Sequence, residues 1–209
     1  MAACPTPENA GKRLVAHIID DMALREPGRT LYVAGKSQQV SDGTFDISAK
    51  DLAQCVNYTS WWIMRVFGRS DEYETLAYIG ITDIRYLVFI IACNKTGYKV
   101  RRSTTALLSC RYVLNQERYQ PLLPSTRNFN DAHLHLLNAT QCSKFVYSVE
   151  RREKALEIKS LRAGLETVQL PSWKEMLESS AAPFPLNKTF QEMENDTALI
   201  LHSSGTTGT

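Results

Sequence analysis

The last residues of the sequence form a loop whose residue types could bind phosphate. It runs Ser203, Ser204, Gly205, Thr206, Thr207 and Gly208. Glycine lets the backbone approach a ligand closely, successive N–H groups can form an anion-binding concavity, and small hydroxyls add further donors. The loop is not a Walker A loop, because the required spacing and its lysine are missing. From composition alone, a flexible Ser/Gly/Thr tail is an equal alternative.

The residues before this loop favour a binding site over a tail. Leu199, Ile200 and Leu201 form a short apolar run that is typical of a buried strand. Linkers seldom follow a core strand without a break. In open α/β sheets, ligands gather beyond the carboxyl ends of the strands, which is where this loop would lie.

Alternating strand and helix patterns extend through the rest of the chain and predict an α/β fold with a mainly parallel sheet. We expect helices at 12–24, 48–67, 83–95, 130–139, 151–163 and 172–179, and strands at 31–34, 45–47, 74–80, 98–100, 122–123, 144–148, 166–170 and 199–201. Residues 181–194 are predicted to be a loop that contains prolines.

Helix boundaries are indicated by capping residues. Ser48 is the expected N-cap of its helix, with Asp51 in the first turn, and Gly68 fits the position after the helix end. Thr82 is the expected cap of the next helix. The neighbouring Trp61 and Trp62 are interpreted as core residues, with ligand stacking as the minor alternative.

Other candidates for chemistry are weaker. His133 and His135 alternate on an expected helix and would point apart, which argues against a metal site built on the two. His202 adjoins the loop but has no visible acid or nucleophile partner. Asp20 and Asp21 are interpreted as a solvated helix face.

Composition bounds the class of protein. The chain has 209 residues, 44% hydrophobic and 22% charged, with a net charge of +2, which is ordinary for a globular chain and gives no indication of nucleic-acid binding. No run has the length of a membrane span, and no signal peptide is visible. The five cysteines are scattered and odd in number, so we expect reduced thiols and a cytoplasmic location. Residues 1–10 are expected to be disordered.

The exact string Ser203–Gly208 resembles the signature loop of the adenylate-forming superfamily, which includes acyl-CoA synthetases and the adenylation domains of nonribosomal peptide synthetases (NRPS). The segments 11–20, 42–62, 73–86 and 95–100 resemble adenylation domains of fungal NRPS-like reductases, enzymes of secondary metabolism. The resemblance implies that 11–209 is a truncated adenylation (AMP-binding) domain, the incomplete N-terminal part of an acyl-adenylating domain with a mainly parallel sheet flanked by helices.

The resemblance also implies a reaction. Adenylation joins a carboxylate to the α-phosphate of ATP, and donors placed around the phosphates lower the barrier. The family assigns Ser203 to Gly208 to the β- and γ-phosphates, and it implies ATP, Mg²⁺, a carboxylic acid substrate and phosphopantetheine on a downstream carrier domain. The family's catalytic lysine and metal contacts follow Thr209, so no catalytic or metal residue is assigned and the chain alone is expected to be inactive. The alternative is a non-catalytic remnant or binding module.

One stretch departs from the family pattern. Residues 101–121 separate Val100 from Leu122, whereas the family joins these two segments directly. The stretch has four Arg residues and a length that keeps the reading frame. A retained intron is one hypothesis, and a true surface insertion, which loops tolerate at little cost, is the other.

Overall fold

The computed structural model describes residues 11–37, 39–70, 74–97, 121–123, 130–194 and 200–201. The expectations for 1–10, for the strand at 98–100, for His202 and for the loop Ser203–Gly208 therefore lie outside the described residues. So does nearly all of 101–121, whose final residue, Pro121, is the first residue of a strand.

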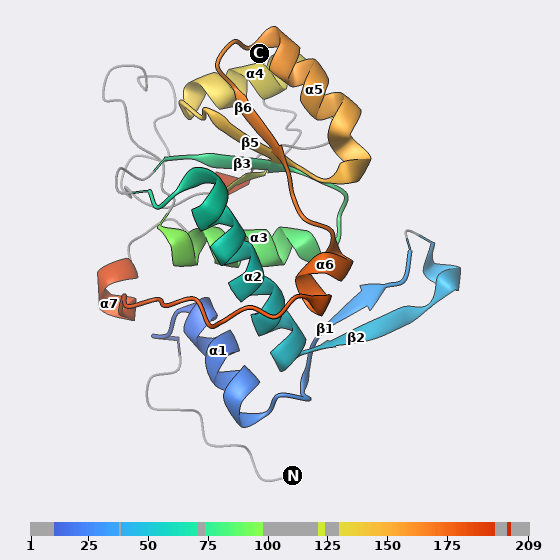
Figure 1. Cartoon of the computed structure of the whole chain (residues 1–209), viewed down its shortest axis with the longest axis vertical. Helices are drawn as coiled ribbons and strands as arrows, with labels where there is room; N and C mark the ends of the chain where they lie inside the picture. The colour runs from blue at the N-terminus through green and yellow to red at the C-terminus, as the bar shows by residue number, and fades with distance from the viewer. Residues whose placement is uncertain are drawn as a thin grey trace.

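The centre of the fold is a five-stranded sheet in which every pairing is parallel. Its strands lie in the order β6-β5-β3-β4-β7 (Figure 1). They are β3 (Leu76–Ile79), β4 (Pro121–Leu123), β5 (Lys144–Tyr147), β6 (Glu166–Gln169) and β7 (Ile200–Leu201). The predicted parallel sheet is thus confirmed.

Helices cover both faces of this sheet. On one side lie α2 (Ala49–Phe67) and α3 (Ile84–Thr96), and on the other lie α4 (Asn130–Ala139) and α5 (Arg152–Leu161), as Figure 1 shows. The helix α1 (Val15–Arg25) packs against α2. The central strands β3 and β5 are therefore largely buried on both faces, as expected for continuous apolar strands.

The central strand β3 contributes side chains to two separate hydrophobic cores. Leu76 and Tyr78 pack into the core under α1, α2 and α3, whereas Ala77 and Ile79 pack into the core under α4 and α5. All four side chains are completely buried. Because successive side chains of a strand point to opposite faces, four residues are enough to join both layers.

A separate antiparallel hairpin, β1 (Thr30–Gly35) and β2 (Thr44–Ser48), extends from the α1–α2 region (Figure 1). It turns through the short 3₁₀ helix η1 (Val40–Asp42) and Gly43, whose φ of 81° is in the region that favours glycine.

Local capping signals define the helix starts, with one correction. Ser48 and Asp51 form a complete capping box at the start of α2, as expected. The cap of α3 is Asp83 and not Thr82, because the Asp83 carboxylate accepts from the backbone N–H of Arg85 at 2.9 Å. A carboxylate is the stronger acceptor and also suits the helix dipole.

The C-terminal part contains η2 (Val149–Arg151), α6 (Trp173–Glu178) and one helix that the sequence prediction missed, α7 (Phe190–Met193). The loop expected over 181–194 therefore ends in a helical turn. Its start is a capping box between Thr189 and Glu192, a signal that the T-x-x-E spacing offers in the sequence.

Residues 179–189, called here the strap, cross the fold without regular secondary structure. Side chains one helical turn apart on α2 bind its backbone: Gln54 donates to the Ser179 carbonyl, and Asn57 Oδ1 accepts from the Phe184 N–H at 3.1 Å. Trp61 Nε1 donates to the carbonyl of Ala182 at 2.9 Å. Trp62 is a core residue, as predicted, whereas the same prediction for Trp61 is wrong, because Trp61 is only half-buried and holds the strap.

Candidate functional site

The candidate site is the edge of the sheet where all five parallel strands have their carboxyl ends. In the sequence, the residues Ser203–Gly208 come shortly after β7, and they lie outside the described residues. Leu123 of β4 pairs with Leu201, and β4 pairs in turn with β3. Since neighbouring strands lie about 4.8 Å apart, β7 ends roughly 10 Å from the end of β3.

A buried arginine ties together the residues that follow β3 and β5. The Arg85 side chain is 5% exposed, and its guanidinium donates to Asp83 at 2.8 Å and to Glu150 at 2.8 Å. Asp83 caps α3, and Glu150 lies just beyond β5 in η2. The three side chains therefore fix the α3 start to the neighbouring strand end. The sequence analysis assigned no role to Arg85 or Glu150.

The charged groups of this cluster shift one another's pKa values. Burial alone would lower the pKa of Arg85, but its hydrogen bonds to Asp83 and Glu150 outweigh burial and raise it. Burial would raise the pKa of Glu150, yet the Arg85 guanidinium holds it below the usual value. The guanidinium already binds two carboxylates. Arg85 is therefore not assigned as a phosphate ligand, and Asp83 and Glu150 are not assigned as Mg²⁺ ligands.

Beside this cluster, two tyrosines close the end of β3. The Tyr86 hydroxyl donates to the carbonyl of Gly80 and accepts from its N–H, both at 3.2 Å. Tyr78 contacts Tyr86 edge-on, with ring centroids 4.9 Å apart. Burial raises the pKa of both phenols, so both stay protonated and neutral at physiological pH.

The structure also shows how the two histidines of α4 are oriented. His133 is buried and His135 exposed on α4, which confirms that the two point apart. Within the described ranges, no cluster of three or more His, Cys, Asp or Glu side chains could hold a metal ion. Likewise, none of the described helices is long and apolar enough to cross a bilayer.

The interpretation of Asp20 as a solvated residue is wrong. Its carboxylate accepts from Lys95 Nζ at 2.7 and 2.9 Å, and the Lys95 side chain is completely buried. Asn57 Oδ1 accepts from the same ammonium at 2.9 Å. A buried ammonium needs a charged partner, so Asp20 has a structural role between α1 and α3, whereas Asp21 forms a partly buried ion pair with Arg13.

The three described cysteines are free and buried. Burial raises the pKa of Cys55 to about 12 and that of Cys142 to about 11, and it raises the pKa of Cys93 as well. These thiols are protonated and unreactive at neutral pH.

Known proteins with this architecture define the class. No protein-family model matches the chain. In structure it resembles the N-terminal domain of FACL13 from Mycobacterium tuberculosis, with a TM-score of 0.63 and 13% identity, over 94% of this chain and 42% of that one. Other structures with the same fold include acyl-CoA and nonribosomal peptide synthetases. The chain therefore has the fold of the N-terminal part of the adenylate-forming enzymes, as predicted.

Sequence relatives narrow the comparison to fungal proteins. The chain is 30% identical over 200 residues to an isocyanide synthase–NRPS hybrid from Aspergillus fumigatus, and equally to a carboxylic acid reductase from Neurospora crassa. Each match covers 95% of this chain but only 12% and 17% of the two relatives. The predicted relationship to fungal NRPS-like and reductase proteins is confirmed over nearly the whole chain.

Proposed function

We propose that this chain forms the N-terminal part of an adenylation domain that activates a carboxylic acid with ATP. The observation that supports it most is the coincidence of a Ser/Thr/Gly loop with the carboxyl end of a parallel strand, in a fold shared with adenylate-forming enzymes. Ser203, Ser204, Gly205, Thr206, Thr207 and Gly208 would bind the β- and γ-phosphates of ATP through N–H and hydroxyl donors.

The rest of the chemistry is proposed for the longer protein to which such a domain belongs. Mg²⁺ would neutralise phosphate charge during transfer, and phosphopantetheine on a carrier domain would accept the activated acyl group. The 209 residues alone are proposed to be inactive, since they cover 17% or less of the relatives. The buried free thiols support a reducing, cytoplasmic setting.

The test is ATP–pyrophosphate exchange with a panel of carboxylic acids, using both the 209-residue chain and the protein at the length that its gene encodes. We expect exchange only from the encoded protein. There, replacing Thr206 and Thr207 together with alanine should lower kcat/KM for ATP by about 100-fold, the order of effect for lost transition-state donors.

The matched control replaces Ser160, an exposed α5 hydroxyl that donates only to the Glu157 carbonyl, with alanine. This variant should keep full exchange. Exchange by the 209 residues alone would refute their inactivity. A complete absence of exchange in the encoded protein would favour the second candidate, a non-catalytic binding module that keeps the α/β scaffold.

The division of the chain into domains is also a proposal. We assign 1–10 to a disordered N-terminus, 11–209 to the truncated adenylation domain and 101–121 to an insertion or retained intron. Sequencing the transcript distinguishes an insertion from a retained intron, because a mature message that contains the codons for 101–121 rules out the intron.

A further inference from the structure

The connection between β6 and β7 has to cross the whole sheet. These two strands are consecutive in the described chain, yet they are the outermost strands of the five-stranded sheet, on opposite sides. With neighbouring strands about 4.8 Å apart, the distance across the sheet is roughly 19 Å. The strap is the part of this connection that crosses, and it runs from α6 to α7 over α2 (Figure 1).

Side chains of α2 bind the strap through its main chain. In addition to its bond to the Ser179 carbonyl, Gln54 accepts from the Ala181 N–H through Oε1 at 3.4 Å. Pro183 and Pro185 have no N–H that docking could leave unpaired, and their fixed φ restricts the undocked segment. The entropy lost when the strap docks is smaller for this reason.

One side chain anchors the strap. Within residues 179–189, all of which the structure describes, only Phe184 is buried. Its ring packs edge-on against Trp61, with centroids 4.7 Å apart, and its N–H donates to Asn57 Oδ1. The same oxygen accepts from the buried Lys95 ammonium, which is paired with Asp20. The surface that receives the anchor is therefore fixed by the ion pair between α1 and α3.

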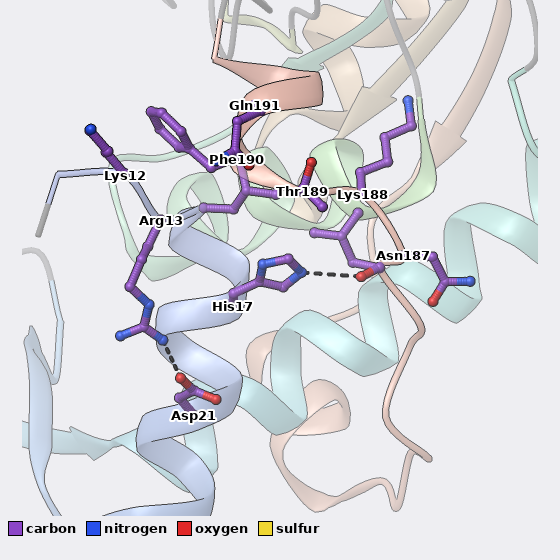
Figure 2. A pocket seen from close by; sticks show the side chains of 11 residues that line it. Lys12, Arg13, His17, Asp21, Asn187, Lys188, Thr189, Phe190 and Gln191 are labelled. Carbon is purple, nitrogen blue, oxygen red and sulfur yellow. Dashed lines mark hydrogen bonds and ion pairs between the residues drawn. The ribbon is translucent and has the colours of Figure 1, made fainter. Parts of the chain in front are cut away.

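The end of the strap and α7 lie beside α1. His17 Nε2 is 3.1 Å from the carbonyl oxygen of Leu186, as the dashed line in Figure 2 marks. A surface pocket of about 580 Å³ lies between α1 and the strap, with Arg13 on one side and Phe190 of α7 on the other (Figure 2). Met193, in the last turn of α7, is 9% exposed. The crossing segment is thus held from α6 as far as α7.

The strand β7 has little to hold it in place by itself. Its two residues pair with β4, whereas strands in globular proteins usually have about three to ten residues. With the strap and α7 docked, the tether that leads to Ile200 begins at Glu194. With the strap undocked, it would begin near Ser179. A shorter tether lowers the entropy cost of closing the loop and raises the effective concentration of β7 at β4.

We propose that the strap is a positioning segment for β7, with Phe184 as its positioning residue. Docking of the strap on α2 keeps β7 beside β4 and so places the residues that follow β7 at the carboxyl ends of the strands. The consequence for a phosphate loop rests on the proposed function, whereas the effect on β7 does not.

The test is amide hydrogen exchange on the 209-residue chain and its Phe184→Ala variant. Loss of the anchor should lower the protection of Ala181 in the strap and of Ile200 and Leu201 in β7 by about tenfold or more, because both segments open together. The strands β3 and β5 should stay protected, which distinguishes local release from global unfolding. Phe184→Leu keeps an apolar anchor and should restore most of the protection.

The matched control is Leu156→Ala, which shortens an α5 side chain that is 45% exposed and should change none of these amides. If Phe184→Ala also exposes β3, the milder Gln54→Ala decides, because it removes both Gln54 bonds to the strap without opening the core and should still lower the protection of β7. Equal protection of Ile200 and Leu201 with and without the anchor, whether high or low, would overturn the inference. An equal loss in Leu156→Ala would do the same.

The protein at its encoded length tests the consequence for the loop. In ATP–pyrophosphate exchange, Phe184→Ala should raise KM for ATP by about tenfold or more through misplaced donors, and Phe184→Leu should largely restore it. An unchanged KM despite lost β7 protection would overturn the placing of the loop. Absence of exchange in the unmodified encoded protein would instead refute the proposed function, and the hydrogen-exchange result would still decide the role of the strap.

Discussion

The phenol of Tyr78 occupies the space that any side chain at position 80 would need. A Cβ atom built on Gly80 would lie 2.2 Å from the Tyr78 hydroxyl oxygen and 2.6 Å from the ring carbon that carries it. Tyr78 is completely buried, so its ring has no open space to move into. The glycine that follows β3 is thus required by the packing of a residue two positions earlier.

The first prediction is that Gly80→Ala destabilises the protein. The added methyl group must displace the Tyr78 ring within a packed core, which costs about 1–3 kcal/mol in comparable overpacking substitutions. Urea denaturation measures the loss. Gly28→Ala is the matched control, because nothing lies within 4 Å of a Cβ at that position. Equal stability of the two variants would contradict the steric account.

The second prediction concerns the unequal roles of the adjacent Asp20 and Asp21. Asp20→Asn leaves the buried Lys95 ammonium without its charged partner and should cost about 3–5 kcal/mol. Asp21→Asn breaks a more exposed pair with Arg13 and should cost less than about 1 kcal/mol. Adding Lys95→Met to Asp20→Asn should restore part of the stability. Similar losses for Asp20→Asn and Asp21→Asn would show that the Lys95 charge is not effectively buried.

The third prediction is an alkaline loss of stability caused by the buried thiols. Burial raises the pKa of Cys55, Cys93 and Cys142 from the ordinary value of 9.0. The folded state therefore favours the neutral thiol, and its stabilisation is complete below pH 9 and falls as the pH rises further, because only the unfolded chain then ionises.

Each thiol contributes a slope of up to about 1.4 kcal/mol per pH unit in this window. Urea denaturation in reducing buffer at about pH 8 and about pH 10 measures the combined slope. Cys55→Ala should lower the stability at the lower pH through its cavity but should also flatten the pH dependence. A free energy of unfolding that stays constant across this range would contradict the prediction.

The fourth prediction tests how the strap is held. Trp61→Phe keeps an aromatic ring near Phe184 but removes the Nε1–H donor to the Ala182 carbonyl, so it should cost about 1 kcal/mol. Limited proteolysis should cut at Lys188, inside the strap, faster than in the original chain. Ser60→Ala is a suitable control, since it removes a hydroxyl of α2 that donates to the Val56 carbonyl within the same helix and not to the strap. An unchanged cleavage rate in Trp61→Phe would mean that Gln54 and Asn57 hold the strap alone.

Features set by local chemistry were predictable from the sequence. The capping box of Ser48 and Asp51 depends on residues three apart, and the parallel sheet follows from the alternation of helices and strands. The capping box of Thr189 and Glu192 was equally local, but the prolines around it favoured a loop prediction and α7 was missed.

Features set by distant partners were not predictable. Asp20 has the sequence context of a surface residue, and only the fold brings Lys95 to it. Arg85 and Glu150 meet because β3 and β5 are neighbours in the sheet, although the two residues are 65 positions apart in the chain. The pocket between α1 and the strap likewise joins residues from both ends of the described chain. The six-residue loop stays a prediction, because it lies outside the described residues.

The strand order also has a consequence for the folding pathway. During synthesis, β3, β4, β5 and β6 leave the ribosome before β7, and among the described strands β7 pairs with β4 alone, as Leu122 with Ile200. Closing such a long chain segment is slow relative to local helix formation. The strand that precedes the proposed phosphate loop would therefore join the sheet late, on a platform that the earlier strands have already assembled. Nascent chains that stall before β7 would leave the edge of β4 unpaired, and an unpaired strand edge is prone to pair with other chains.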